Sequence, residues 1–100
     1  MIIKFERSGG FMGRNTSLTL DVGELPSNQA EKIRHLLEDA NFVMLNEELV
    51  SHPMPDEFNY TITVETDDLH HTVHTSDSSA PDSLRPLIHE LTERARRAQR

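Results

Sequence analysis

The chain has 100 residues, of which 35% are hydrophobic, and this size fits one small domain with a modest core. Its formal net charge of −7 argues against a nucleic-acid partner, because phosphate contacts need a concentration of Lys and Arg. The chain contains no cysteine, which excludes disulfides, thiol catalysis and cysteine-based zinc sites.

The N-terminal part of the chain predicts a hairpin followed by a helix. Apolar and polar side chains alternate over residues 3–6 and again over residues 17–22, which predicts two strands. Glycines between them supply turn geometry, so we expect a hairpin with a loop longer than two residues. Ser27 is the expected N-cap of the helix. One helical face is apolar and comprises Ala30, Ile33, Leu36, Leu37 and Ala40.

The second half of the chain repeats this order. Apolar and polar side chains alternate most clearly over residues 58–65, which predicts a strand. Asp67-Asp68 is expected to form a turn, and residues 69–75 the return strand. Ser76 to Ser79 is expected to be a polar connector, and the last helix to begin at Ser83 with Pro86 in its first turn. The less regular segment before this hairpin should reach the core through Phe42, Val43, Leu45 and Leu49.

The predicted order is strand, strand, helix, strand, strand, helix, and each strand has one mainly apolar face. This pattern predicts an α+β fold, a four-stranded antiparallel sheet with two helices packed on one face, over residues 1–100 as a single domain. The first residues contain no long apolar run, so we expect no secretory signal and take the cytoplasm as the default compartment, with export by another route left open. No stretch approaches the length that spans a bilayer.

The histidines raise the question of a metal site. His70 and His74 should share the polar face of a strand while His71 points inward, and residues four apart on a strand are separated by roughly 13 Å. That distance is too long for one shared ion, so we expect no metal and no cofactor. Two pairs at helical spacing fit surface pairs better than two-ligand sites: His35 with Asp39, and His89 with Glu93.

No pattern of residues indicates catalysis. The acidic pairs Glu47-Glu48 and Asp67-Asp68 fit solvated turns, and the serines of residues 76–79 lack a nucleophile-elbow pattern. We therefore expect no enzymatic activity. The only basic cluster fits either a helix C-terminus or contact with an acidic surface, and comprises Arg94, Arg96, Arg97 and Arg100.

The expected hairpin loop places Phe11 and Met12 between glycines. A large apolar pair at the tip of a turn is a candidate for insertion into a partner's pocket. The alternative is that Phe11 folds back and covers the edge of the sheet, and both interpretations stay open. Met54 lies between prolines and is expected to be exposed, whereas Phe58 is expected in the core.

Several segments resemble one family in the same order along nearly the whole chain. They are Phe5-Glu-Arg-Ser-Gly-Gly-Phe11, Leu20-Asp21, Pro55-Asp56-x-Phe58-x-Tyr60, His71-Thr-Val73 and Pro81-Asp-Ser-Leu-Arg-Pro-Leu87. Together these segments resemble emfourin, a family of small protein inhibitors of thermolysin-like zinc metalloproteases. The resemblance implies a thermolysin-like metalloprotease as partner and an inhibitor that blocks its active-site cleft.

The physical character of the loop indicates which residues would bind the protease. Backbone groups of Ser8, Gly9 and Gly10 would offer hydrogen bonds, Phe11 or Met12 an apolar anchor, and Arg14 closes the segment. Residues 52–57, from His52 to Glu57, are a second candidate contact. We expect a monomer when free, with no membrane and no nucleic acid as partner. The rival is a non-catalytic interaction domain or accessory subunit that docks through its sheet face or edge; a small hydrolase or isomerase has no supporting residues.

Overall fold

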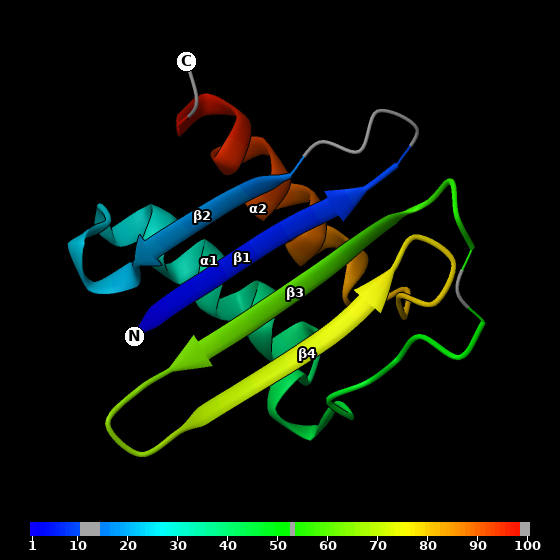
Figure 1. The fold of residues 1–100 in the computed structure, drawn as a ribbon. Coiled ribbons are helices and arrows are strands. Elements are labelled where there is room, and N and C mark those ends of the chain that lie inside the picture. The colour runs from blue at the N-terminus through cyan, green and yellow to red at the C-terminus, as the bar shows by residue number, and fades with distance from the viewer. Residues whose placement is uncertain (11–14, 53, 99–100) are drawn as a thin grey trace.

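A computed structural model describes residues 1–10, 15–52 and 54–98. The strands are β1 (Ile2–Gly9), β2 (Thr16–Asp21), β3 (Phe58–Glu65) and β4 (His70–Ser76), and the helices are α1 (Ser27–Asp39) and α2 (Arg85–Ala98). Two short 3-10 turns, η1 (Val22–Glu24) and η2 (Phe42–Met44), flank α1. The order of the elements along the chain confirms the predicted one (Figure 1).

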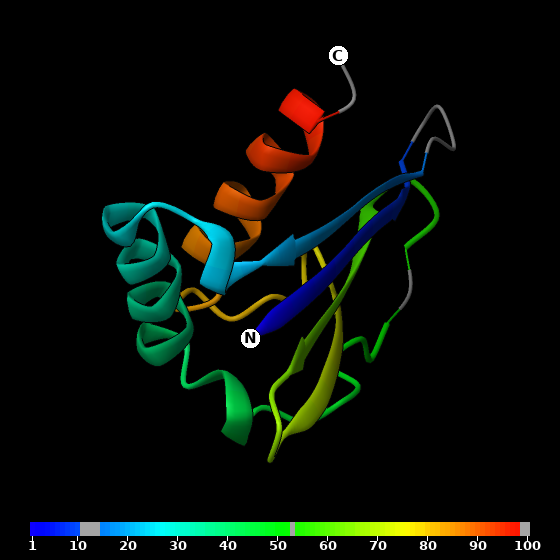
Figure 2. The same ribbon diagram turned by 90° about the vertical axis from the view of Figure 1, so that its left-hand side faces the viewer.

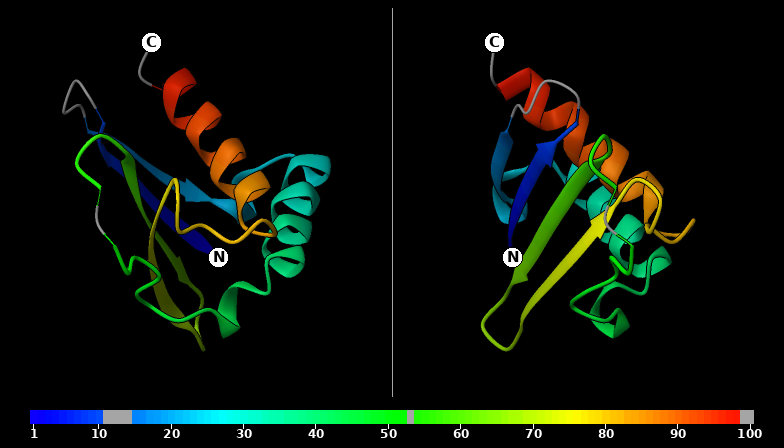
Figure 3. Two further views of the ribbon diagram at one scale, coloured as in Figure 1. Left: turned by 90° about the vertical axis from the view of Figure 1, so that its right-hand side faces the viewer. Right: turned by 45° about the vertical axis from the view of Figure 1, so that its right-hand side comes forward.

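The four strands form one antiparallel sheet in the order β2-β1-β3-β4. Phe5 of β1 pairs with Leu18 on one side and with Ile62 on the other, so the two hairpins join through β1 and β3. Both helices lie on the same face of the sheet and leave the other face open, which confirms the predicted α+β class (Figures 2 and 3). In the described part of the chain, no helix combines the length and the apolar composition needed to cross a bilayer.

Alternation along the strands puts the core between the sheet and the helices. The fully buried strand residues Ile3, Ile62 and Val73 share the face that meets the helices. Ile33 of α1 and Leu91 of α2, at positions predicted to be apolar, are likewise fully buried. Burial of one such side chain contributes about 1.5–3 kcal/mol, so these positions hold the layers together.

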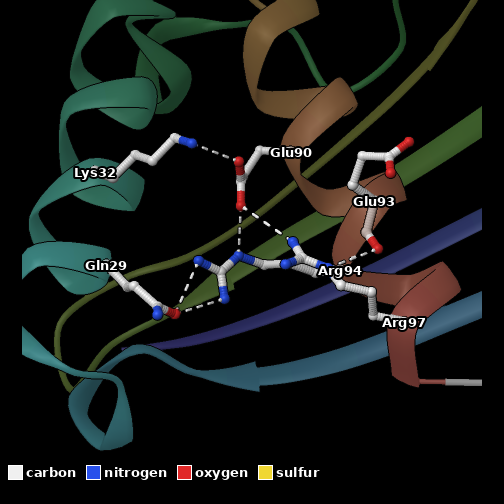
Figure 4. Close-up of polar contacts among 6 residues, drawn as sticks. All are labelled: Gln29, Lys32, Glu90, Glu93, Arg94 and Arg97. Carbon is white, nitrogen blue, oxygen red and sulfur yellow. Dashed lines mark hydrogen bonds and ion pairs between the residues drawn. The ribbon is translucent and has the colours of Figure 1, made fainter.

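Hydrogen-bonded ion pairs join the two helices through the largely buried side chains of Glu90 and Arg94 (Figure 4). The Glu90 carboxylate accepts from Lys32 Nζ of α1 at 2.9 Å and from Arg94 Nε at 2.7 Å, and Arg94 also donates to Gln29 of α1 at 3.3 Å. Burial raises the pKa of Glu90, but the hydrogen bonds and charges of Lys32 and Arg94 together outweigh it and lower the pKa. Arg94 of the basic C-terminal cluster therefore links the helices.

Two further arginines of that cluster, Arg96 and Arg97, lie in the last turn of α2. Arg96 lies 3.3 Å from the Glu93 carboxylate, and Arg97 Nε donates to the Glu93 carbonyl oxygen at 3.4 Å. Positive charge near a helix C-terminus interacts favourably with the helix dipole. This agrees with the first of the two interpretations of the basic cluster, a helix C-terminus. Arg100 lies outside the described residues.

Three local predictions were wrong. Ser27 is the first helical residue and not the cap: extended Pro26 precedes it, and the Pro26 carbonyl accepts from Gln29 and Ala30, each at 2.9 Å. Val43 does not anchor the core but is 53% exposed, because the tight turn η2 directs Phe42 inward and its neighbour outward. Ser76 is no connector residue: it ends β4 fully buried, with its hydroxyl 2.7 Å from that of Ser79.

The start of the second helix also differs from the prediction. The helix α2 begins at Arg85 and not at Ser83, because Leu84 donates its N–H to Pro81 in a turn that precedes the helix. Pro86 stands in the first turn of α2, as predicted, where its missing N–H leaves no hydrogen bond unmade.

Candidate functional site

The candidate site lies at the end of β1, where the chain enters the hairpin loop (Figure 1). Gly9 and Gly10 have φ angles of +87° and +75°, which side chains rarely tolerate. A Cβ on Gly10 would stand 2.5 Å from the Phe58 ring, and one on Gly9 would stand 3.0 Å from the Glu57 carbonyl oxygen. Glycine is therefore required at both positions for the backbone to follow this path.

The Phe58 ring is the platform against which this end of β1 packs. The Arg7 guanidinium carbon lies 3.5 Å from the centre of the ring, a cation–π geometry. Arg7 has the same strand register as Ile3 and Phe5, so its side chain lies on the helix-facing side of the sheet. Phe58, predicted in the core, is only partly buried and packs against the edge of the core.

A turn after β4 fastens the start of β3. The carboxylate of Asp77 accepts from Phe58 N at 3.0 Å and from the Tyr60 hydroxyl at 2.6 Å, while Asp77 N donates to the Phe58 carbonyl at 3.1 Å. Ser78 donates from its backbone and its hydroxyl to the Glu57 carboxylate at 3.1 and 3.0 Å. Burial and the bond to Asp77 raise the pKa of Tyr60. The base of the site is thus held by short polar contacts before any partner arrives.

Two candidate contacts that are far apart in sequence lie side by side. Gly10 donates its N–H to the Glu57 carbonyl oxygen at 3.2 Å, which joins the end of β1 to the segment that precedes β3. Met54 in that segment is 56% exposed, as predicted. A partner that contacts Ser8 to Gly10 would therefore also meet the residues just before β3.

The predicted protease-binding residues fall into two groups. The structure describes three of them, Ser8, Gly9 and Gly10, at the end of β1. Ser8 lies opposite Asn59 in the sheet. Phe11, Met12 and Arg14 lie outside the described residues, as does Pro53 of the second candidate contact. The protease-binding roles of all six residues, and of the second candidate contact, stay predictions.

The three clustered histidines each have a different neighbour. His70 lies 3.3 Å from Glu65, His71 Nε2 lies 2.8 Å from the Leu45 carbonyl oxygen, and His74 Nδ1 lies 2.9 Å from Glu48. His71 also meets Phe42 edge-on at 5.5 Å between ring centres, which confirms that it points inward. Over residues 1–10, 15–52 and 54–98, no group of three or more His, Cys, Asp or Glu side chains could hold a metal ion.

Other polar pairs are structural. The hydrogen bond from His74 lowers the pKa of the Glu48 carboxyl, and the backbone around Glu48 pairs with the outer edge of β4. On α1, His35 lies 4.0 Å from Glu38, three residues on, and not beside Asp39 as the spacing suggested.

The sequence reasoning missed a cleft beside the candidate site. It has a volume of about 400 Å³ and lies between α2 and the same end of the sheet, lined by Arg7, Tyr60, Asp77 and residues of α2. One signal was present in the sequence: the alternation that turns Ile3 and Phe5 inward also turns Arg7 inward. An arginine in an inward register needs a polar environment, and the cleft supplies it.

Comparison with known proteins gives a family match over most of the chain. The model of the family described as Emfourin matches residues 5–92. No curated protein matches the chain. Among solved structures, emfourin (M4in) from Serratia proteamaculans, described as an M4 family peptidase inhibitor, is 16% identical, and the alignment covers 86% of this chain and 83% of that one with a TM-score of 0.42. The span of the family match contains every described residue of the candidate site.

Proposed function

Because the chain belongs to the emfourin family, we propose that it is a protein inhibitor of thermolysin-like zinc metalloproteases. The observation that carries this proposal is the family match over residues 5–92. The resemblance of the separate sequence segments described above agrees with it. The proposal makes the chain a binding protein and not an enzyme.

We further propose that the loop from Ser8 to Arg14 enters the active-site cleft of the protease. Such clefts bind an extended peptide, and a pre-organised loop that fits without being cut blocks them. The geometry of the loop base supports this role, since the Gly10 N–H is bonded to the Glu57 carbonyl oxygen and both glycines lie close against Glu57 and Phe58, which fixes the path of the chain into the loop. Phe11 or Met12 would then fill an apolar pocket beside the scissile-bond position.

The segment before β3 is proposed as the second contact. Exposed Met54 is an adaptable apolar side chain, and the Gly10–Glu57 hydrogen bond places its segment next to the loop base. Two adjacent contacts would bury more surface than one loop and would fix the orientation of the inhibitor in the cleft.

The test is an inhibition assay with purified chain against several thermolysin-like proteases, with a serine protease as the control target. Inhibition of one or more metalloproteases with an unaffected serine protease supports the proposal. Binding to a partner with no loss of proteolysis would favour the rival, an interaction domain that docks through its open sheet face or through the edge strand β2.

A further inference from the structure

The cleft between α2 and the sheet is lined by three arginines of a chain whose net charge is −7. Arg7 comes from β1, and Arg85 and Arg96 come from opposite ends of α2. The other polar lining residues that carry charge are Asp77 and Glu93. The cleft is therefore a local concentration of positive charge on an acidic protein.

The two carboxylates of the cleft already have partners. Both oxygens of Asp77 accept hydrogen bonds, from Tyr60 and from the backbone of Phe58, and Glu93 lies 3.3 Å from Arg96. By contrast, the Nε of Arg7 is buried and has no hydrogen-bond partner among the residues that the structure describes. A buried donor without an acceptor is unfavourable, so Arg7 has hydrogen-bonding capacity that the described residues leave unused.

The geometry of arginine selects the kind of acceptor. A guanidinium presents a planar fork of donors that matches the two oxygens of a carboxylate. The Arg7 guanidinium carbon lies 3.5 Å from the centre of the Phe58 ring, which holds the group in place. Among the described residues Arg85 forms one ion pair, with the fully exposed Asp82 at 3.4 Å, and water already screens that contact. Arg85 can therefore turn toward a ligand at small cost. Arg96 stays paired with Glu93 and contributes its charge to the cleft from there.

We propose that this cleft is a receptor for a carboxylate, the side chain of an Asp or Glu that borders the active-site cleft of the target protease. This inference rests on the proposed function for the source of the carboxylate, but the binding chemistry belongs to the free chain. Arg7 directly precedes Ser8, so a protease seated on the loop base brings its surface to the mouth of the receptor. The loop would occupy the active site while the cleft holds an acidic side chain beside it.

The free protein carries its own reporter for this site. Tyr60 lines the cleft, and it is the only tyrosine of a chain that has no tryptophan. Its intrinsic fluorescence therefore reports on the cleft alone. We would titrate the free chain with sodium succinate at constant ionic strength held by NaCl, and repeat the titration with inorganic phosphate.

The variants separate the receptor from general electrostatics. Arg7→Met removes the charge but keeps an apolar side chain on Phe58, and Arg96→Gln changes an arginine that is 58% exposed, so the fold is not at risk there. Arg97→Gln is the matched control, because Arg97 is the next residue on α2, is 65% exposed and does not line the cleft.

We expect the fluorescence of Tyr60 to change with succinate and to saturate. Arg7→Met and Arg96→Gln should each weaken the affinity for succinate about tenfold. Arg97→Gln should leave that affinity unchanged. A response equal to that of NaCl, equal affinity in all variants, or saturation with phosphate alone would overturn the carboxylate receptor.

A second measurement tests the source of the carboxylate. In the protease assay, Arg7→Met and Arg96→Gln should raise the inhibition constant about tenfold, whereas Arg97→Gln should match the parent. Inhibition by Arg7→Met and Arg96→Gln at the parent's strength would overturn the assignment to a protease side chain even if succinate binds. A parent chain that inhibits no metalloprotease would refute the proposed function, and the succinate titration would still decide the receptor.

Discussion

The backbone N–H of Gly10 donates to the carbonyl oxygen of Glu57 at 3.2 Å. This bond ties the end of the first strand to the residues that precede the third, although the two residues are far apart in the sequence. It continues the pairing of β1 with β3 by one step beyond Gly9 and Phe58. The proposed inhibitory loop therefore starts from a backbone that is fixed on one side by the sheet.

The first prediction concerns the glycine at this bond. Gly10→Val should raise the inhibition constant at least about tenfold, because a branched side chain at φ +75° meets the Phe58 ring and displaces the loop base. We expect the melting temperature to fall by a few degrees, as for a loss of about 1–2 kcal/mol. Gly23→Ala is the control, since its Cβ meets only the Asp21 side chain, at 3.3 Å, and should leave inhibition unchanged. Parent-like inhibition by Gly10→Val would move the binding surface away from this loop.

The second prediction concerns Phe11, which lies outside the described residues. If Phe11 is the anchor in the protease, Phe11→Ala should weaken binding by about 2 kcal/mol or more and leave the melting temperature nearly unchanged. If Phe11 instead packs on the sheet, the same change should cost about 3 kcal/mol of folding stability. Met44→Ala is a control for the loss of an exposed apolar side chain, because Met44 is 74% exposed and lies beyond α1.

The third prediction concerns Glu90. Glu90→Gln should destabilise the fold by about 1–3 kcal/mol at neutral pH, since Lys32 and Arg94 would lose their charged partner. The folded-state pKa is below the ordinary 4.5, so the contribution is fully present above that value and is lost as the pH falls through the folded pKa. Denaturant unfolding at pH 7 and at pH 3 measures both effects. Glu31→Gln, at an exposed position of α1, is the control. A stability difference between the parent and Glu90→Gln that does not shrink at low pH would contradict this prediction.

The fourth prediction is that a chelator leaves the thermal unfolding of the free chain unchanged. The three clustered histidines point to separate partners at Glu65, Leu45 and Glu48 and do not converge. Melting curves with and without EDTA measure this. A large fall in melting temperature that added zinc reverses would show that a metal stabilises the fold.

Much of the fold could be predicted because alternation and helical spacing are local signals. Residues 58–65 alternate without a break, and the structure has a strand over the same residues. The prediction that Val43 reaches the core was wrong because a 3-10 turn has a different period from an α-helix, so apolar neighbours do not share a face. The prediction that Ser76 lies in a polar connector was wrong because its hydroxyl is hydrogen-bonded to that of Ser79 across a turn, which allows Ser76 to be buried. The periodicity of the sequence does not reveal such a contact.

The candidate site could be predicted only in part. Glycines and apolar residues identified the loop, because their chemistry is unusual for a turn. Hydrogen bonds join residues 77 and 78 to Phe58 and Glu57, and these bonds depend on how the two hairpins pack. The cleft around Arg7 depends on the same packing. Contacts between segments distant in the chain follow from the assembled fold and leave little trace in a single sequence.

The most direct test of inhibition is a titration of a thermolysin-like protease, at an enzyme concentration well above the dissociation constant, with peptide cleavage as the readout. The account predicts that activity falls linearly to near zero at about one chain per enzyme, and that the chain is recovered uncut. Full activity in the presence of excess chain, or activity that returns as the chain is cleaved, would contradict it.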